Sequence, residues 1–374
     1  MNPVIPPGSK IGILGGGQLG RMFAIAARRM GYRVHTFEPT PDSPAGQVSD
    51  VEVAAPYEDL DAIREFAREV SVISFEFENI PLPALEAASE VCPVRPKGEV
   101  LYICQNRERE KMFLSRNGFP CAAFRVVDSA PDLQRALSEI GTPSVLKTAD
   151  FGYDGKGQLI IQRPTDDPEG LWNQFGAPRA VLEAWIAFEA ELSVIVARGM
   201  DGTVRAFPAS ENIHTNHILD LSIVPARLPA PVLATANELA IAIAEKLDLV
   251  GLLAVELFMA KDGSLVVNEL APRPHNSGHF TFDACVTSQF EQQLRAVCGL
   301  PLGTTDLLTP AVMWNLLGDF WKEGEPDWNR ILNHPNAKLH LYGKAEPRPG
   351  RKMGHVTFLG DPNETLRSLH SLRG

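Results

Sequence analysis

The chain has 374 residues, of which 44% are hydrophobic and 22% charged, enough for two or three globular domains with their own cores. Its 35 basic and 46 acidic side chains give a net charge of −11, which argues against broad binding to nucleic acid or anionic membranes. The five cysteines show no CxxC spacing and indicate neither a disulfide framework nor a zinc site. Because we find neither a signal-peptide pattern nor a membrane-spanning apolar run, we expect a cytoplasmic protein.

The first predicted unit is a βαβ segment with a glycine-rich turn. A strand over 10–14 leads into GGGQLG at 15–20, a helix to Met30, and a second strand that ends before Glu38. This G-x-G-x-x-G pattern, with an acid 18 residues past Gly20, is typical of dinucleotide-binding folds. The same turn amides would serve any other phosphate or carboxylate, so both interpretations stay open.

Two acids and a charged helix come next. Glu76 and Glu78 lie at the carboxyl end of a predicted strand, where open α/β sheets place ligands. A boundary at 93–98 precedes a helix whose charges at 106–111 are predicted to form mostly a solvated face. On this pattern Arg107 is no more than a candidate ligand.

A second glycine-rich segment lies between two predicted strands. The strand 144–147 ends in Lys147 and is followed by FGYDGKGQ at 151–158 and a strand at 159–161. No Lys-Ser/Thr pair opens a helix here, so the segment is not a Walker A motif. Glycine alone would also fit a flexible hairpin loop. Together with nearby basic residues and a downstream carboxylate pair, the segment predicts a mobile lid over phosphates.

Polar side chains accompany the following strand. Glu183 lies in the strand 181–186 and Glu191 just beyond it, where each could accept hydrogen bonds from adenine or ribose or could simply face water. His214 and His217 are predicted in a polar loop, where a structural role is as plausible as a functional one.

The segment 253–270 predicts a β-hairpin with a carboxylate inside each strand. The Asp-Gly pair at 262–263 is the strongest short signal for a two-residue type I′ turn. With these two residues as the loop, Glu256 faces Glu269 at a β-carbon separation of roughly 5 Å. Two unit charges there repel by about 3 kcal/mol at an effective dielectric near 20. The pair therefore indicates a protonated glutamate or a bound cation, with a divalent metal the simpler solution. The alternative is a bulge that turns one glutamate to solvent.

Two more polar segments follow the hairpin. The loop APRPHNSGH at 271–279 is stiffened by two prolines and crowds Arg273 and two histidines beside the carboxylate pair, which favours an anionic substrate. The last 65 residues are predicted to form a smaller, strand-rich unit, in which 343–355 is the clearest basic cluster. That cluster is either a solvated hairpin tip or a contact for a phosphate-bearing substrate.

In order along nearly the whole chain, these motifs resemble the ATP-grasp superfamily and, within it, the N5-carboxyaminoimidazole ribonucleotide synthetase family. The similarity rests on GGGQLGRM at 15–22, GYDGKGQ at 152–158, NELAPRPHNSGH at 268–279, TSQFE at 287–291 and RPGRKMGH at 348–355. It implies a multidomain α/β and α+β protein with a Rossmann-like pre-ATP-grasp domain at 1–104, an ATP-grasp domain at 105–302 whose lid spans about 120–190, and a small C-terminal β domain at 303–374.

The resemblance also assigns site residues. It places ATP at Arg107, Lys147, Gly152, Tyr153, Asp154, Gly155, Lys156, Gly157, Gln158, Glu183, Ile186, Glu191, His214, Asn268 and Glu269. It places the second substrate at Gln18, Glu78, Tyr153, Lys156, Arg273, Arg351 and Lys352. Catalytic roles fall to Lys147, Asp154 and Arg273, and the magnesium ligands are Glu256 and Glu269. Many superfamily members have an asparagine ligand where this chain has Ala271, which leaves a second magnesium open.

The implied reaction is the ATP- and bicarbonate-dependent carboxylation of 5-aminoimidazole ribonucleotide through carboxyphosphate, in purine biosynthesis. The resemblance also implies a homodimer and handover of the product to a mutase. Rival interpretations are a noncatalytic ATP sensor, a nicotinamide dehydrogenase and the formate-using transformylase of the same superfamily. A sensor need not keep both Glu256 and Glu269, and a dehydrogenase would leave the 152–158 loop unexplained.

Overall fold

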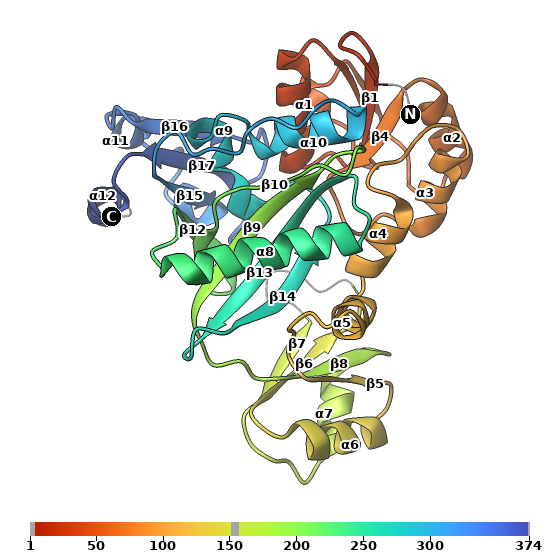
Figure 1. The fold of residues 1–374 in the computed structure, drawn as a ribbon, viewed down its shortest axis with the longest axis vertical. Helices are drawn as coiled ribbons and strands as arrows, with labels where there is room; N and C mark the ends of the chain where they lie inside the picture. Colours follow the sequence, from red (N-terminus) through yellow and green to blue (C-terminus); the bar gives the residue numbers. More distant parts are fainter. Residues whose placement is uncertain (1–3, 151–156, 373–374) are drawn as a thin grey trace.

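The computed structural model describes residues 4–150 and 157–372, which form three sheets (Figure 1). The N-terminal sheet is parallel, in the order β3-β2-β1-β4. Strands β1, β2 and β4 are buried almost throughout, because helices and neighbouring segments cover both faces, as a parallel sheet requires. The elements are β1 (Lys10–Leu14), α1 (Gln18–Arg29), β2 (Arg33–Phe37), η1 (Gly46–Val48), β3 (Val51–Val53), α2 (Leu60–Arg68), β4 (Val72–Phe75) and α3 (Leu82–Ser89).

A small antiparallel sheet forms a separate layer at one end of the molecule (Figure 1). Its order is β5-β8-β6-β7, and its two helices begin at side-chain caps, Ser129 for the first and Asp167 for the second. It is reached through α4 (Gly98–Cys104) and α5 (Arg107–Arg116). Its elements are β5 (Phe124–Val127), α6 (Ala130–Ile140), β6 (Ser144–Thr148), β7 (Gln158–Ile161), α7 (Pro168–Phe175) and β8 (Ala180–Ala184). This sheet occupies the region predicted to be the lid.

The remaining strands of the described residues form one large sheet in the order β14-β13-β9-β11-β12-β15-β17-β16, with β10 paired to β9. The C-terminal strands therefore continue the sheet of the predicted ATP-grasp domain instead of forming a sheet of their own. The strands are β9 (Phe188–Arg198), β10 (Val204–Ala206), β11 (Ser210–Thr215), β12 (Ile218–Val224), β13 (Gly251–Ala260), β14 (Leu265–Ala271), β15 (Ala311–Leu317), β16 (Ala337–Leu341) and β17 (Lys352–Leu359).

Helices cover both faces of this sheet. They are α8 (Ala230–Lys246), η2 (Asn276–Gly278), α9 (Thr281–Ala284), α10 (Gln289–Cys298), η3 (Gly318–Trp321), α11 (Trp328–Leu332) and α12 (Pro362–Leu372). Val255 and Leu257 of β13 pack in the core under α8, whereas Ala254 packs on the opposite face with Phe280. Because side chains alternate along a strand, Glu256 lies on the face away from α8. Within the described ranges, none of the helices is long and apolar enough to cross a membrane.

Candidate active site

The carboxylate hairpin has the predicted facing pair but not the predicted turn. Gly263 N–H donates to Ala260 O at 2.9 Å, and Ala260 pairs with Ser264, so the loop has three residues with Gly263 at φ 81°. Pairs near the turn are consequently shifted by one residue, and the predicted two-residue turn was wrong. A register shift beyond Glu256 restores the alignment, and Glu256 pairs with Glu269 as predicted.

The extra residue behind this shift is Asn268. Val267 and Leu270 both pack in the core under α8, so two residues between them, Asn268 and Glu269, turn toward the cavity. A β-bulge has this effect because it places two residues opposite one on the partner strand. The bulge thus brings Glu269 into line with Glu256 and adds the Asn268 amide, whose Nδ2 lies 3.5 Å from Glu256 Oε2.

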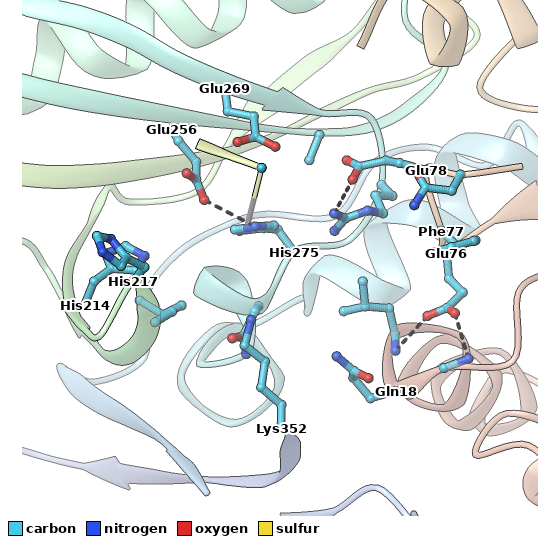
Figure 2. A pocket seen from close by; sticks show the side chains of 18 of the residues that line it. Gln18, Glu76, Phe77, Glu78, His214, His217, Glu256, Glu269, His275 and Lys352 are labelled. Carbon is cyan, nitrogen blue, oxygen red and sulfur yellow. Dashed lines mark hydrogen bonds and ion pairs between the residues drawn. The ribbon is translucent and has the colours of Figure 1, made fainter. Parts of the chain in front are cut away.

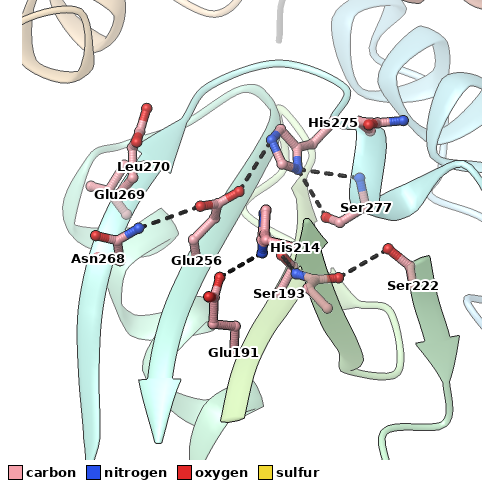
Figure 3. Close-up of polar contacts among 12 residues, drawn as sticks. Glu191, Ser193, His214, Ser222, Glu256, Asn268, Glu269, Leu270, His275 and Ser277 are labelled. Carbon is pink, nitrogen blue, oxygen red and sulfur yellow. Dashed lines mark hydrogen bonds and ion pairs between the residues drawn. The ribbon is translucent and has the colours of Figure 1, made fainter. Parts of the chain in front are cut away.

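Within the carboxylate pair, Arg107 lies 4.0 Å from Glu269, whereas the two side chains beside Glu256, Asn268 and His275, leave its charge unbalanced. Burial, followed by the charge of Glu269, raises the pKa of Glu256 to about 7. His275 Nε2 lies 3.3 Å from Glu256 Oε1, but burial and then Arg273 hold the pKa of His275 well below its usual range. Its ring is therefore neutral at pH 7. Figure 3 shows Glu256 between Asn268 and His275.

The pair fits one kind of cation. Within residues 4–150 and 157–372, no group of three or more His, Cys, Asp or Glu side chains has the geometry to hold a metal ion alone. Magnesium, however, is commonly held by one or two carboxylates together with phosphate oxygens and water. Glu256 and Glu269, facing each other across the strands, match that donor set.

Cationic side chains gather opposite the pair, around Glu183. Lys147 Nζ donates to Glu183 Oε2 at 3.0 Å, and Lys111 Nζ lies 3.7 Å from the same oxygen. Arg107 reaches both acids, at 3.9 Å from Glu183 Oε1 and 4.0 Å from Glu269 Oε2. Burial alone would raise the pKa of Glu183, but these cations lower it to about 2. Three cations around one carboxylate leave an excess of positive charge for a polyphosphate.

The charges of α5 were predicted mostly to face solvent, and for several of them this was wrong. Glu110 is 1% exposed and Lys111 is fully buried. Both contact β14: Lys111 Nζ donates to Asn268 O at 2.9 Å, and Glu110 Oε2 accepts from Leu270 N at 2.8 Å. The sequence held a usable signal, because Lys111 follows Arg107 by one helical repeat of four and therefore shares its face.

The glycine-rich turn before α1 is filled by the protein's own carboxylates. Glu76 Oε1 accepts from Gly17 N at 2.7 Å, and Glu76 Oε2 accepts from the amides of Leu19 and Gly20, each at 3.1 Å. Glu38 accepts from Gly16 N at 2.8 Å. Burial raises the pKa of Glu76, although the amides oppose that rise. These amides are therefore not available to a dinucleotide phosphate, and the carboxylate-binding alternative describes this turn.

Aromatic and acidic side chains line the other end of the site. Phe188 stacks on Phe258, with centroids 4.5 Å apart and an interplanar angle of 7°. His214 lies on β11 instead of in a loop, with its Nδ1 2.7 Å from Glu191 Oε2. The aromatic pair was not predicted from the sequence, although Phe258 follows Glu256 on the same face of β13.

The loop after the hairpin joins the N-terminal unit to the large sheet. Arg273 Nη2 donates to Glu78 Oε2 at 2.7 Å. Burial raises the pKa of Glu78, and Arg273 opposes that rise. The basic segment lies nearby, where Lys344 Nζ donates to Lys352 O at 2.7 Å. In Figure 2, Lys352 lies across the pocket from Glu256 and Glu269, with His275 between them.

These side chains border one cavity of about 1330 Å³. It is lined by every predicted site residue within the described ranges, namely Gln18, Glu78, Arg107, Lys147, Gly157, Gln158, Glu183, Ile186, Glu191, His214, Glu256, Asn268, Glu269, Arg273, Arg351 and Lys352. The predicted contacts Gly152, Tyr153, Asp154, Gly155 and Lys156 lie outside the described residues. Such a volume is large enough for two substrates side by side.

Comparisons with known proteins agree with this architecture. Residues 9–105 match the ribonucleotide synthetase preATP-grasp domain, 112–290 the ATP-grasp domain, and 311–369 the phosphoribosylaminoimidazole carboxylase C-terminal domain. The N5-carboxyaminoimidazole ribonucleotide synthase of Bacillus subtilis is 49% identical over 362 residues, which cover 96% of this chain and 94% of that protein. The chain belongs to the N5-carboxyaminoimidazole ribonucleotide synthase family. As a member of this family it is an ATP-dependent ligase, and the predicted fold class is confirmed.

Solved structures of N5-carboxyaminoimidazole ribonucleotide synthetases share the fold over the whole chain. An ADP complex of one such enzyme is 46% identical and has a TM-score of 0.94, with 100% of this chain and 98% of that chain covered. The Aspergillus clavatus enzyme in complex with ADP and 5-aminoimidazole ribonucleotide is 31% identical and has a TM-score of 0.89, with 97% of each chain covered. The domain boundaries expected from the sequence remain predictions.

Proposed function

We propose that this protein carboxylates 5-aminoimidazole ribonucleotide with bicarbonate at the expense of ATP, as part of purine biosynthesis, and that Glu256 and Glu269 hold magnesium during the reaction. The observation that carries the proposal is the facing carboxylate pair, with the pKa of Glu256 raised to about 7, directly opposite a cluster of cations. The pair and the cluster together provide for a metal-bound polyphosphate.

The first chemical step follows from the weakness of bicarbonate as an electrophile. A bicarbonate oxygen attacks the γ-phosphorus of ATP, the bond to ADP breaks, and carboxyphosphate forms. When bound, magnesium would neutralise charge on the phosphate oxygens. We assign Lys147 and Arg107 to stabilise the same charge from the protein side, since both line the cavity as part of the cation cluster around Glu183.

The second step transfers the carboxyl group. The exocyclic amine of the ribonucleotide attacks the carboxyl carbon of carboxyphosphate, or of carbon dioxide released from it, and inorganic phosphate leaves. We place Arg273 beside the carboxyphosphate, and Gln18, Glu78, Arg351 and Lys352 around the ribonucleotide, since all of them line the same cavity. The walls must exclude water, because carboxyphosphate would otherwise hydrolyse.

Isotope labelling tests the first step. With oxygen-18 bicarbonate, one labelled oxygen is expected in the inorganic phosphate, because the attacking oxygen stays bonded to phosphorus. Unlabelled phosphate, with exchange into water controlled, would rule out carboxyphosphate. Bicarbonate is expected to support both ADP release and product formation, whereas formate is not. Comparable product with formate would favour the transformylase reaction instead. The homodimer, the cytoplasmic location and the handover to a mutase remain predictions.

A further inference from the structure

The edge of the large sheet is held by charged side chains from α5. The strand β14, which carries Glu269, is the outermost strand on its side of this sheet. On its outer side, Val267 N donates to Pro120 O at 2.8 Å, and α5 supplies partners for further backbone groups. Lys111 Nζ donates to Asn268 O at 2.9 Å and lies 3.4 Å from Val267 O, and Glu110 Oε2 accepts from Leu270 N at 2.8 Å.

These contacts coincide with the bulge. Asn268 is the extra residue that restores the register between Glu256 and Glu269, and the three backbone groups held by α5 belong to residues 267, 268 and 270. Both residues flanking Glu269 are thus fixed, one through its carbonyl and one through its amide. A change of one residue in register would turn Glu269 to the opposite face of the sheet.

A pair of neutral polar side chains would satisfy these backbone groups at a lower desolvation free energy than a buried acid and a buried amine. Glu110 and Lys111 are 1% and 0% exposed, and burying a charge is unfavourable unless it is closely paired. The cost is visible at Glu110, where burial raises the pKa to about 8 although Lys111 opposes the rise. Lys111 also belongs to the cation cluster around Glu183, whereas Glu110 Oε2 contacts the Leu270 amide. A buried acid at this amide points to a demand for rigidity at this strand.

We propose that Glu110 and Lys111 are positioning residues for Glu269: they clamp the backbone of the bulge and so hold the second carboxylate in register with Glu256. The inference rests on the proposed magnesium role of that pair. Removing the Glu110 contact leaves both carboxylates and the cations around Glu183 in place but lets the separation of the carboxylates vary, which weakens metal binding before it affects either substrate. Groups that orient a metal ligand typically change metal affinity by about 10- to 100-fold when mutated.

The experiment compares Glu110→Ala, Glu110→Gln and Lys111→Met with Arg116→Met, an exposed position near the end of the same helix. The readout is the magnesium concentration at half-maximal turnover, measured at saturating ATP and ribonucleotide. Glu110→Ala and Lys111→Met are expected to raise this midpoint about 10- to 100-fold. Glu110→Gln keeps an acceptor for the Leu270 amide and is expected to recover most of the loss, while Arg116→Met leaves the midpoint unchanged.

Hydrogen exchange in the metal-free protein tests the clamp itself. The Leu270 amide is expected to exchange faster in Glu110→Ala than in the wild type, with Glu110→Gln in between. A purely structural edge cap would lower stability yet leave the magnesium midpoint of the folded fraction within twofold of the wild type, and that result would overturn the proposal. If Lys111→Met does not fold, Lys111→Arg and the two Glu110 variants decide. If instead the proposed magnesium role of the carboxylate pair is wrong, Glu256→Gln will itself have the wild-type magnesium midpoint. This result distinguishes failure of the proposed function from failure of the clamp.

Discussion

Two carboxylate sites border the same cavity, and they differ in how their charge is satisfied. Glu76 accepts from three backbone amides at the start of α1, so the polypeptide itself completes that site. Glu256 instead faces Glu269 and a neutral His275, and its pKa rises to about 7. We infer that the first site is structural and propose that a cation completes the second. On this proposal the glycine-rich turn stabilises the fold, and the carboxylate hairpin carries the chemistry.

Removing charge from the hairpin should have the largest effect. Glu256→Gln and Glu269→Gln keep the shape of the side chain but remove a magnesium ligand, so turnover should fall by about 100- to 1000-fold with the fold intact. Steady-state ADP release with matched circular dichroism spectra checks this. Near-normal turnover at saturating magnesium in either variant would show that this pair does not bind a catalytic metal, and the contrast with the structural site at Glu76 would fail.

The basic segment 343–355 is predicted to bind the second substrate, aminoimidazole ribonucleotide. Lys352→Ala should raise the apparent KM for aminoimidazole ribonucleotide about 10- to 100-fold, because a charge-assisted phosphate contact is lost. The KM for ATP should change far less. Initial rates with each substrate varied in turn measure both constants. An unchanged KM for the ribonucleotide would return this segment to the solvated-hairpin alternative.

Glu76→Ala should act on stability instead of metal binding. It leaves three amides without their acceptor, and a buried unsatisfied group costs about 1–3 kcal/mol, so the urea midpoint of unfolding should drop clearly. The magnesium midpoint of the folded enzyme should stay unchanged. Wild-type stability together with a shifted magnesium midpoint would contradict the structural role of Glu76 and indicate that it acts on metal binding.

A smaller effect is expected in the pH dependence of stability. Because the pKa of Glu256 is raised from 4.5 to about 7, the folded state binds this proton more tightly than the unfolded state. Stability should therefore fall as the pH rises from about 4.5 to 7, and this loss is complete above pH 7. Metal-free Glu256→Gln should unfold at a higher temperature than the wild type at pH 8 but not at pH 5. Equal differences at both pH values would argue against the raised pKa.

Some of this site followed from the sequence and some could not. Period-2 alternation and the Asp-Gly turn predicted that Glu256 pairs with Glu269, as the structure has it. The prediction succeeded through two cancelling deviations, however, since the three-residue loop shifts the register and the bulge at Asn268 restores it. Bulges are set by packing, here of Val267 and Leu270 under α8, and local sequence does not reveal them.

The burial of charged groups was the harder part. A helix with many charges is usually a solvated face, and only the tertiary fold places Glu110 and Lys111 against the edge of β14. The self-filled glycine turn was equally hidden, because Glu76 lies 56 residues after Gly20 in the chain. Long-range contacts of this kind depend on the topology of the sheet and not on any local pattern.

Proton release on metal binding tests the central claim most directly. At pH 7 a carboxyl with a pKa of about 7 is half protonated, so binding of magnesium with ADP should release about half a proton more from the wild type than from Glu256→Gln. Calorimetry in buffers of different ionisation enthalpy measures this difference, which should vanish at pH 9. Equal proton release from the two proteins at pH 7 would contradict the assignment of Glu256 as a ligand whose charge is completed by the metal.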